Sequence, residues 1–154
     1  MSEIKDLYTK RVIDNRNVKM VDAIKELLGK ADVHSLDVAV GYFYLSGLLL
    51  IKDEFIRFMT EQQGHFSILM GNETNHATQQ LFTAKDANES YFEQLPEIIN
   101  QDTMTVSDTD FLRQIGQWIN QHRIEVKVYT GEANYFHAKS YLFCQSAEGF
   151  DGYA

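Results

Sequence analysis

Apolar residues recur at steps of three and four along several parts of the chain, which is the spacing of a helix with one buried face. This pattern predicts helices over about 18–31, 48–62, part of 74–100, and from Ser107 or Asp108 to about 122. Gly29 is typical of the end of the first helix, and Ser46 stands where the second would have its N-cap.

Four shorter runs are rich in β-branched and aromatic residues, which favour strands. They predict strands over 35–44, 66–70, 124–130 and 136–143. The first is apolar almost throughout after Asp37, as in a strand buried on both faces, whereas the third alternates strictly, as in a half-buried strand. Only a turn over 131–134 separates the last two strands, so we expect them to pair as an antiparallel hairpin.

The order of these elements predicts an α/β fold with a single domain over 1–154. Strand, helix and strand over 35–70 form a βαβ unit, whose crossover is expected to be right-handed. We expect a mixed β-sheet flanked by helices on both faces, with the core over about 33–154 and the helix over 18–31 before it. The residues from Gly152 onward look like the start of a further strand, so we expect a fragment of a longer protein that stops before its last strand.

Composition narrows the functions expected of this fold. A chain of 154 residues with 44% hydrophobic content is the size of one ordinary domain. Its 14 Lys and Arg against 22 Asp and Glu give a net charge of -8, which argues against a broad basic surface, so any anion site must be local. Apolar runs such as the one over 47–51 are far too short to span a membrane, and the single Cys144 suits a reducing compartment, so we expect a cytoplasmic protein.

His137 and Lys139 stand two residues apart in the strand expected over 136–143, so their side chains would share one face. An imidazole beside an ammonium on a rigid strand is chemistry suited to a phosphate group. Tyr141 would lie on the same face and line the pocket, although simple packing explains it as well. The alternative for the pair is a half-exposed strand whose polar face happens to carry His and Lys.

Two further places in the sequence have features of phosphate-binding turns. Ser46 and Gly47, at an expected helix start, would hold an anion through backbone N–H groups, though capping explains them equally well. Gly71 and Asn72 end a strand, where a turn is the ordinary explanation. The remaining histidines have no metal-ligand spacing, so no metal site is expected; they are His34, His65, His76 and His122.

The element order and several motifs together resemble the phospholipase D-like superfamily. The resemblance covers roughly 33–153 and rests on the runs Val40 to Leu48, Leu69 to Gly71 and Val126 to Tyr129, and on His137-Ala138-Lys139. More narrowly, the chain looks like the phospholipase D-like domain at the N-terminus of bacterial superfamily-two helicases of restriction and defence type. The resemblance implies the phospholipase D-like fold, and a helicase motor in the same polypeptide.

What the resemblance implies for chemistry is a nuclease or phosphodiesterase that acts on DNA without a metal. His137 would be the nucleophile that forms a phosphohistidine, or the proton donor, and Lys139 would clamp the phosphate. With one His-x-Lys motif in the chain, a complete site needs a second copy, from a homodimer or from another part of a longer protein. No cofactor is implied for this domain; ATP and Mg²⁺ would serve only a helicase part outside the chain.

The chain also departs from the family pattern, which keeps other functions open. Where the family has Asp after the motif, the chain has Cys144, and the family's Gly-Ser-x-Asn element is missing. These departures and the net charge of -8 favour a catalytically inactive module that binds DNA or a partner protein for the helicase. A lipid-cleaving enzyme is a weaker alternative, because the sequence offers no amphipathic helix rich in Lys and Arg.

Overall fold

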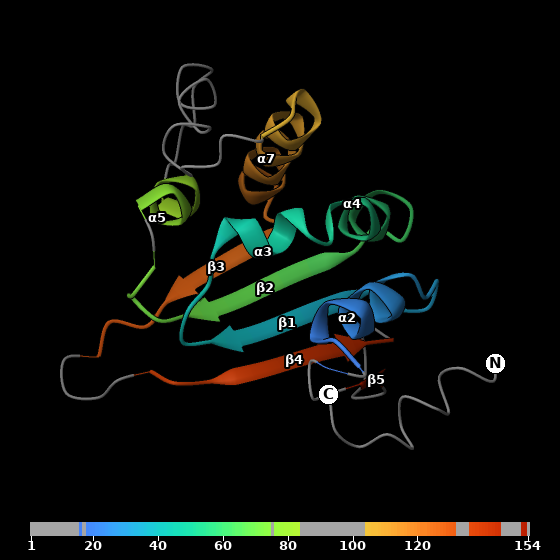
Figure 1. Ribbon diagram of the computed structural model, residues 1–154, viewed down its shortest axis with the longest axis horizontal. Helices are drawn as coiled ribbons and strands as arrows, with labels where there is room; N and C mark the ends of the chain where they lie inside the picture. Colours follow the sequence, from blue (N-terminus) through green and yellow to red (C-terminus); the bar gives the residue numbers. More distant parts are fainter. Residues whose placement is uncertain are drawn as a thin grey trace.

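The computed structural model, drawn in Figure 1, describes residues 16, 18–74, 76–83, 104–131, 136–145 and 152–153. The helices in these ranges are α2 (Met20–Leu28), α3 (Leu45–Leu49), α4 (Lys52–Thr60), α5 (His76–Thr83) and α7 (Val106–Asn120). The strands are β1 (Ser35–Val40), β2 (His65–Met70), β3 (Ile124–Val128), β4 (Lys139–Cys144) and β5 (Gly152–Tyr153). None of these described helices has the length and apolar character needed to cross a membrane. Of the helices expected within 74–100, α5 is present, and 84–100 lies outside the described residues.

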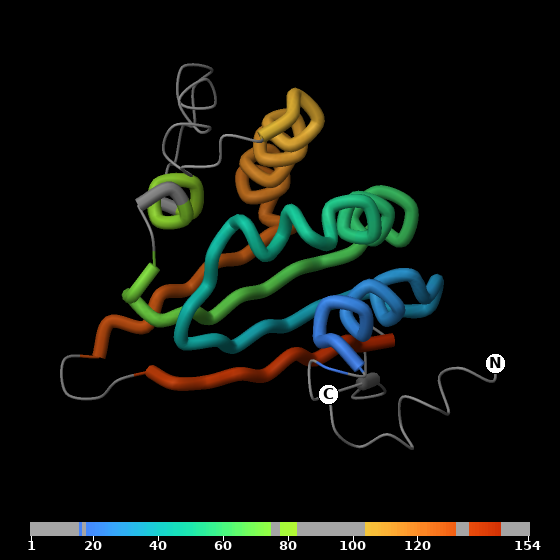
Figure 2. Tube along the Cα trace, in the orientation of Figure 1, coloured from blue at the N-terminus to red at the C-terminus, as the bar shows by residue number. Residues whose placement is uncertain are grey.

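The strands form a five-stranded sheet in the order β3-β2-β1-β4-β5. β1, β2 and β3 run parallel, whereas β4 runs antiparallel to β1, and β5 runs antiparallel to β4. Figure 2 shows β4, late in the sequence, lying beside β1, which comes early in it. The expected α/β fold with a mixed sheet is confirmed, and the strand expected to begin at Gly152 is present as β5.

The expected hairpin between β3 and β4 is wrong. β3 lies at the edge of the sheet beside β2, and β4 lies on the far side of β1. β3 ends at Val128 and β4 begins at Lys139, so the connection over 129–138 is much longer than the turn that was expected. β3 and β4 are three strand spacings apart in the sheet, or about 14 Å. An extended segment with the number of residues in 129–138 reaches roughly 33 Å, so the connection is long enough to pass β2 and β1 before β4 begins.

Burial alternates along the strands, and this places the described helices on one face of the sheet. In β1, Leu36, Val38 and Val40 are buried, whereas the residues between them are partly exposed. β4 adds Tyr141 and Phe143 to this face, because they pair with Val38 and Leu36. Each described helix contributes buried side chains to the core on this same face. The sequence led us to expect helices on both faces, and in the described ranges they cover one face. The apolar run over 38–44 suggested a strand buried on both faces, but β1 ends at Val40 and the rest of the run lies in the connection that follows.

Phe55 of α4 lies at the centre of the core. It is fully buried, and its ring contacts those of Phe58, Phe66, Phe111 and Trp118 at centroid distances of 5.3 to 6.1 Å. Tilted and edge-on aromatic pairs of this kind add about 0.5–1.5 kcal/mol each to the burial of apolar surface. Phe55 therefore ties α4 to β2 and to α7.

The helix expected over 48–62 consists of two helices, α3 and α4. α3 begins at Leu45 after the N-cap Tyr44, so Ser46 lies in the first turn and is not the N-cap. The N–H of Leu45 instead donates to Oγ1 of the buried Thr78, at 3.1 Å. Because this acceptor comes from α5, 33 residues further along the chain, the local sequence around Ser46 does not reveal it.

α7 begins slightly earlier than expected. Its N-cap is Thr105, whose side chain accepts a hydrogen bond from the N–H of Asp108, while the Asp108 carboxylate accepts one from the N–H of Thr105. Asp108 also pairs with Lys52 of α4, with 2.7 Å between Nζ and Oδ1. The hydrogen bond from Lys52 and then that from Thr105 lower the pKa of Asp108 to about 2. This pair joins the starts of α4 and α7.

Candidate functional site

The parallel strands β1, β2 and β3 end at one edge of the sheet, at Val40, Met70 and Val128. β4 is antiparallel and therefore begins at this edge, with Lys139 opposite Val40. We call this region the carboxyl edge and define it by residues 40–42, 70–72, 128–129 and 136–139. Ligands of open α/β sheets bind outside the carboxyl ends of the strands, which makes this edge the candidate site.

Gly41 holds the segment that carries His137 against the end of β1. Its N–H donates to the carbonyl oxygen of Ala138 at 2.9 Å. A Cβ at position 41 would stand 2.6 Å from the carbonyl oxygen of Phe136 and 3.4 Å from Cα of His137. Glycine is therefore required here, because any side chain would push the segment over 136–138 away from the sheet.

Gly71 makes a second close approach at the same edge. Its N–H donates to the carbonyl oxygen of Val40 at 3.1 Å, and a Cβ on it would overlap the carbonyl oxygen of Gly41. Asn72 follows directly and is exposed. Gly71 and Asn72 therefore belong to the same edge as the His-x-Lys motif.

His137 and Lys139 are both exposed at the carboxyl edge. Lys139 is the first residue of β4 and shares the helix-covered face of the sheet with Tyr141. His137 precedes the strand, so strand alternation does not set the direction of its side chain. The strand expected over 136–143 is thus correct only from Lys139 onward, and the backbone of His137 is positioned by the contact of its segment with Gly41.

Aromatic rings border the motif, a feature that the sequence patterns did not indicate. The ring of Tyr129 stacks on that of Phe136 with centroids 5.3 Å apart, and the N–H of Tyr129 donates to the carbonyl oxygen of Met70 at 2.8 Å. Tyr42, directly after Gly41, is 42% exposed. The sequence feature that could have pointed to this edge is Gly41, which interrupts an apolar run. A glycine in such a position often marks a close approach of two backbones.

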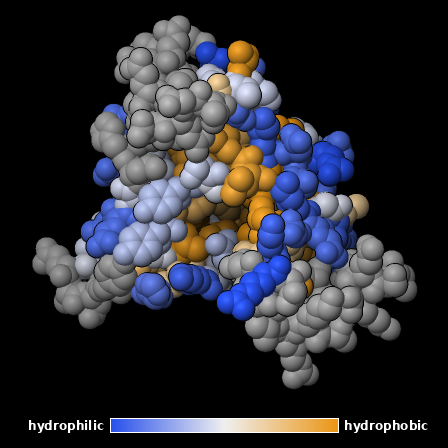
Figure 3. All heavy atoms as spheres, viewed as in Figure 1, coloured by the Kyte–Doolittle hydropathy of each residue, from blue (hydrophilic) through white to orange (hydrophobic). Residues whose placement is uncertain are grey.

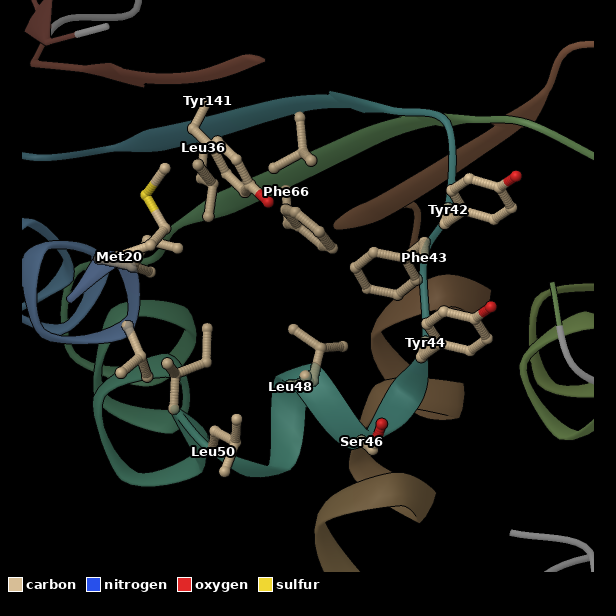
Figure 4. Close-up of a pocket in the computed structure, with 15 residues that line it drawn as sticks. Met20, Leu36, Tyr42, Phe43, Tyr44, Ser46, Leu48, Leu50, Phe66 and Tyr141 are labelled. Carbon is tan, nitrogen blue, oxygen red and sulfur yellow. The ribbon is translucent and has the colours of Figure 1, made fainter. Parts of the chain in front are cut away.

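Tyr141 and Ser46 lie elsewhere, around a cavity of about 480 Å³ between α2, α3 and the sheet. Figure 4 shows Tyr141 on the sheet side of this cavity and Ser46 on the α3 side. Burial raises the pKa of Tyr141 above that of an ordinary tyrosine. The expected site residues therefore fall into two groups: Ser46 and Tyr141 at the cavity, and His137, Lys139, Gly71 and Asn72 at the carboxyl edge.

Cys144 lies at the opposite end of β4 from Lys139. It pairs with Ser35 at the start of β1 and with Gly152 of β5. A rise of about 3.4 Å per residue puts the Cα atoms of Cys144 and Lys139 roughly 17 Å apart. The position where the resemblance implies an Asp is therefore remote from the carboxyl edge.

The chemistry available at the carboxyl edge is that of an imidazole and an ammonium. Lys139 offers N–H donors to phosphate oxygens, and an imidazole such as that of His137 serves as a nucleophile or as a proton donor. Among the residues that the structure describes, no group of three His, Cys, Asp or Glu side chains is arranged to hold a metal ion. The side chains of His137 and Lys139 suit an attack on a phosphate ester.

Comparisons of the chain with protein-family models, with curated proteins and with solved structures find no significant match. A functional assignment therefore has to come from the residues of the carboxyl edge and their geometry.

Proposed function

We propose that this chain is a phospholipase D-like domain of a helicase-type protein and hydrolyses phosphodiester bonds of DNA through His137 and Lys139. One observation carries the proposal: the His-x-Lys segment is anchored on Gly41 at the carboxyl edge, where α/β sheets bind ligands. Both side chains are exposed, which leaves them accessible to the phosphates of a large polymer.

Hydrolysis takes two displacements at phosphorus. In the first, the imidazole of His137 attacks, a P–N bond forms, and the bond to the leaving oxygen breaks as a second imidazole protonates that oxygen. In the second, water attacks the phosphohistidine and gives a proton to the second imidazole, which releases His137. Lys139 stabilises the negative charge on the nonbridging oxygens in both transition states.

The second imidazole comes from another copy of the motif. A homodimer with its two-fold axis beside the carboxyl edge would bring two His137 side chains to one phosphate. In that arrangement one His137 is the nucleophile and the partner's His137 is the proton donor. The exposed position of the motif at the edge of the sheet fits this requirement.

The second candidate function is a catalytically inactive module that binds DNA or a partner protein. The net charge of -8 favours the form of this candidate that binds a partner protein, because a nuclease and a DNA-binding module both have to approach a polyanion. The replacement of the family's Asp by Cys144 also favours it. The distance of Cys144 from Lys139 along β4 weakens this second point, because no group beside the motif is lost.

Cleavage of labelled DNA in the presence of EDTA separates the two candidates. The protein is incubated with single- and double-stranded DNA beside two variants, His137→Ala and the control Ser140→Ala, whose residue lies on the opposite face of β4 from Lys139. The enzyme proposal expects cleavage that persists in EDTA, is unchanged in the control, and falls at least about 100-fold in His137→Ala. DNA binding without cleavage by the wild type would support the module and contradict the enzyme.

A further inference from the structure

The cavity between α2, α3 and the sheet is walled mainly by apolar side chains. Figure 3 shows a hollow on this face, with hydrophobic residues at its centre and hydrophilic residues around it. In Figure 4, Met20 of α2, Leu48 of α3, and Leu36 and Phe66 of the sheet surround the open space. The cavity is therefore bounded by three separate parts of the fold.

The described residues that line this cavity include no charged side chain. Their polar side-chain groups are hydroxyls, of which that of Tyr141 points into the open space from β4. A tyrosine phenol is neutral at physiological pH and can both donate and accept a hydrogen bond, and burial raises the pKa of Tyr141 further. The wall thus offers apolar surface together with a neutral hydrogen-bonding group.

We propose that this cavity binds an uncharged, mainly apolar small molecule that carries one polar group for the hydroxyl of Tyr141. Its volume of about 480 Å³ falls within the range of small-molecule sites, roughly 300–1,000 Å³. A charged ligand would lose its hydration with no opposite charge in the described wall to compensate. A peptide is disfavoured for a related reason, because each of its residues brings an N–H and a C=O that need partners.

This site meets the carboxyl edge at Tyr42, but His137 and Lys139 do not line it, so the proposal does not depend on hydrolysis by His137. Ser46 and Tyr141 line the cavity and not the edge, which gives them a role in a second kind of ligand site. Binding there is measured on the full chain without any phosphodiester substrate, and a failure of either proposal leaves the other intact.

Two fluorescent probes form a matched pair for the test, N-phenyl-1-naphthylamine and 1-anilinonaphthalene-8-sulfonate. They share the same ring system and differ by one sulfonate. In a fluorescence titration we expect the uncharged probe to saturate at one site per chain, with a Kd at least about ten-fold lower than that of the anionic probe. Equal or tighter binding of the anionic probe, or no saturable binding of the uncharged one, would overturn the proposal.

Two tryptophan variants locate the bound probe. Ile24→Trp places a large ring at the α2 wall of the cavity, and Val106→Trp adds the same ring at a position that is 80% exposed and not part of the wall. We expect binding of the uncharged probe to weaken at least about ten-fold in Ile24→Trp and to stay unchanged in Val106→Trp. Unchanged binding in a folded Ile24→Trp protein sinks the proposal. If that variant does not fold, the preference of the wild type between the two probes decides the question.

Discussion

Gly71 lies so close to Gly41 that a Cβ on Gly71 would overlap the carbonyl oxygen of Gly41. Gly41 in turn lies against the backbone of Phe136 and His137. These contacts bring the end of β1, the end of β2 and the start of the His-x-Lys segment together at one edge. The position of the proposed nucleophile therefore depends on two glycines that have no chemistry of their own.

Replacement of Gly71 by alanine tests this close packing. The added Cβ forces the backbones apart, so we expect a loss of about 1–3 kcal/mol in the free energy of unfolding, measured by urea denaturation. Gly47→Ala is the matched control, because no atom lies within 4 Å of the added Cβ and the residue is in α3. The control is expected to gain up to about 1 kcal/mol. A Gly71→Ala protein as stable as the wild type would contradict the close approach.

The ion pair between Asp108 and Lys52 makes stability depend on pH. The folded-state pKa of Asp108 is about 2, below its ordinary value of 3.8. Its contribution is therefore complete above the ordinary value and is lost as the pH falls from there through the folded value. We expect Asp108→Asn to lower the free energy of unfolding by about 1 kcal/mol near pH 6, after allowance for solvent screening.

The same comparison at low pH supplies the control for Asp108. Near pH 2 the difference between the wild type and Asp108→Asn should be much smaller than near pH 6, because the carboxyl group is then almost fully protonated in the unfolded state and about half protonated in the folded state. Urea denaturation at both pH values measures the two differences. A difference that stays constant or grows on acidification would show that the charge of Asp108 is not what stabilises the fold.

The hydrogen bond from Leu45 to Thr78 is expected to hold the start of α3 on α5. Thr78→Val keeps the shape of the side chain and removes the buried acceptor, so we expect a loss of about 1–3 kcal/mol in the free energy of unfolding. Thr109→Val is a matched control, because the bond of that hydroxyl to Thr105 is long, 3.4 Å, and exposed. The control should change stability by no more than about 0.5 kcal/mol. Equal losses in both variants would argue against a special role for Thr78.

Helices and strands whose pattern of apolar residues is set by the local sequence could be predicted. The strand expected over 66–70 is β2 to within one residue, and the helix expected from Ser107 or Asp108 is α7, shifted at its start. In both, the spacing of apolar residues matches one buried face, which is a local property of the chain. The α/β class followed from the order of such elements.

Contacts between distant residues could not be predicted in this way. Alternation in β4 indicates that Tyr141 and Lys139 share a face, but it does not say whether β1 or β3 is the neighbouring strand. The prediction that Ser46 caps α3 was wrong for a similar reason. The acceptor for the N–H of Leu45 is Thr78, which lies in another helix. The spacing of His137 and Lys139 identified the motif from the sequence. The role of Gly41, which hydrogen-bonds to the segment that carries His137, was not predicted, because Gly41 lay inside the strand expected over 35–44.

A covalent adduct on His137 tests the proposed catalysis most directly. A DNA cleavage reaction in EDTA is quenched rapidly in alkali, in which phosphohistidine is stable, and the digested protein is analysed by mass spectrometry. Because attack on a phosphodiester leaves the phosphorus esterified to one side of the cut DNA, we expect a nucleotide-bearing phosphoryl adduct on the peptide that contains His137 in the wild type and in Ser140→Ala, and none in His137→Ala. Cleavage of DNA with no adduct on this peptide, or cleavage that continues unchanged in His137→Ala, would contradict the proposal.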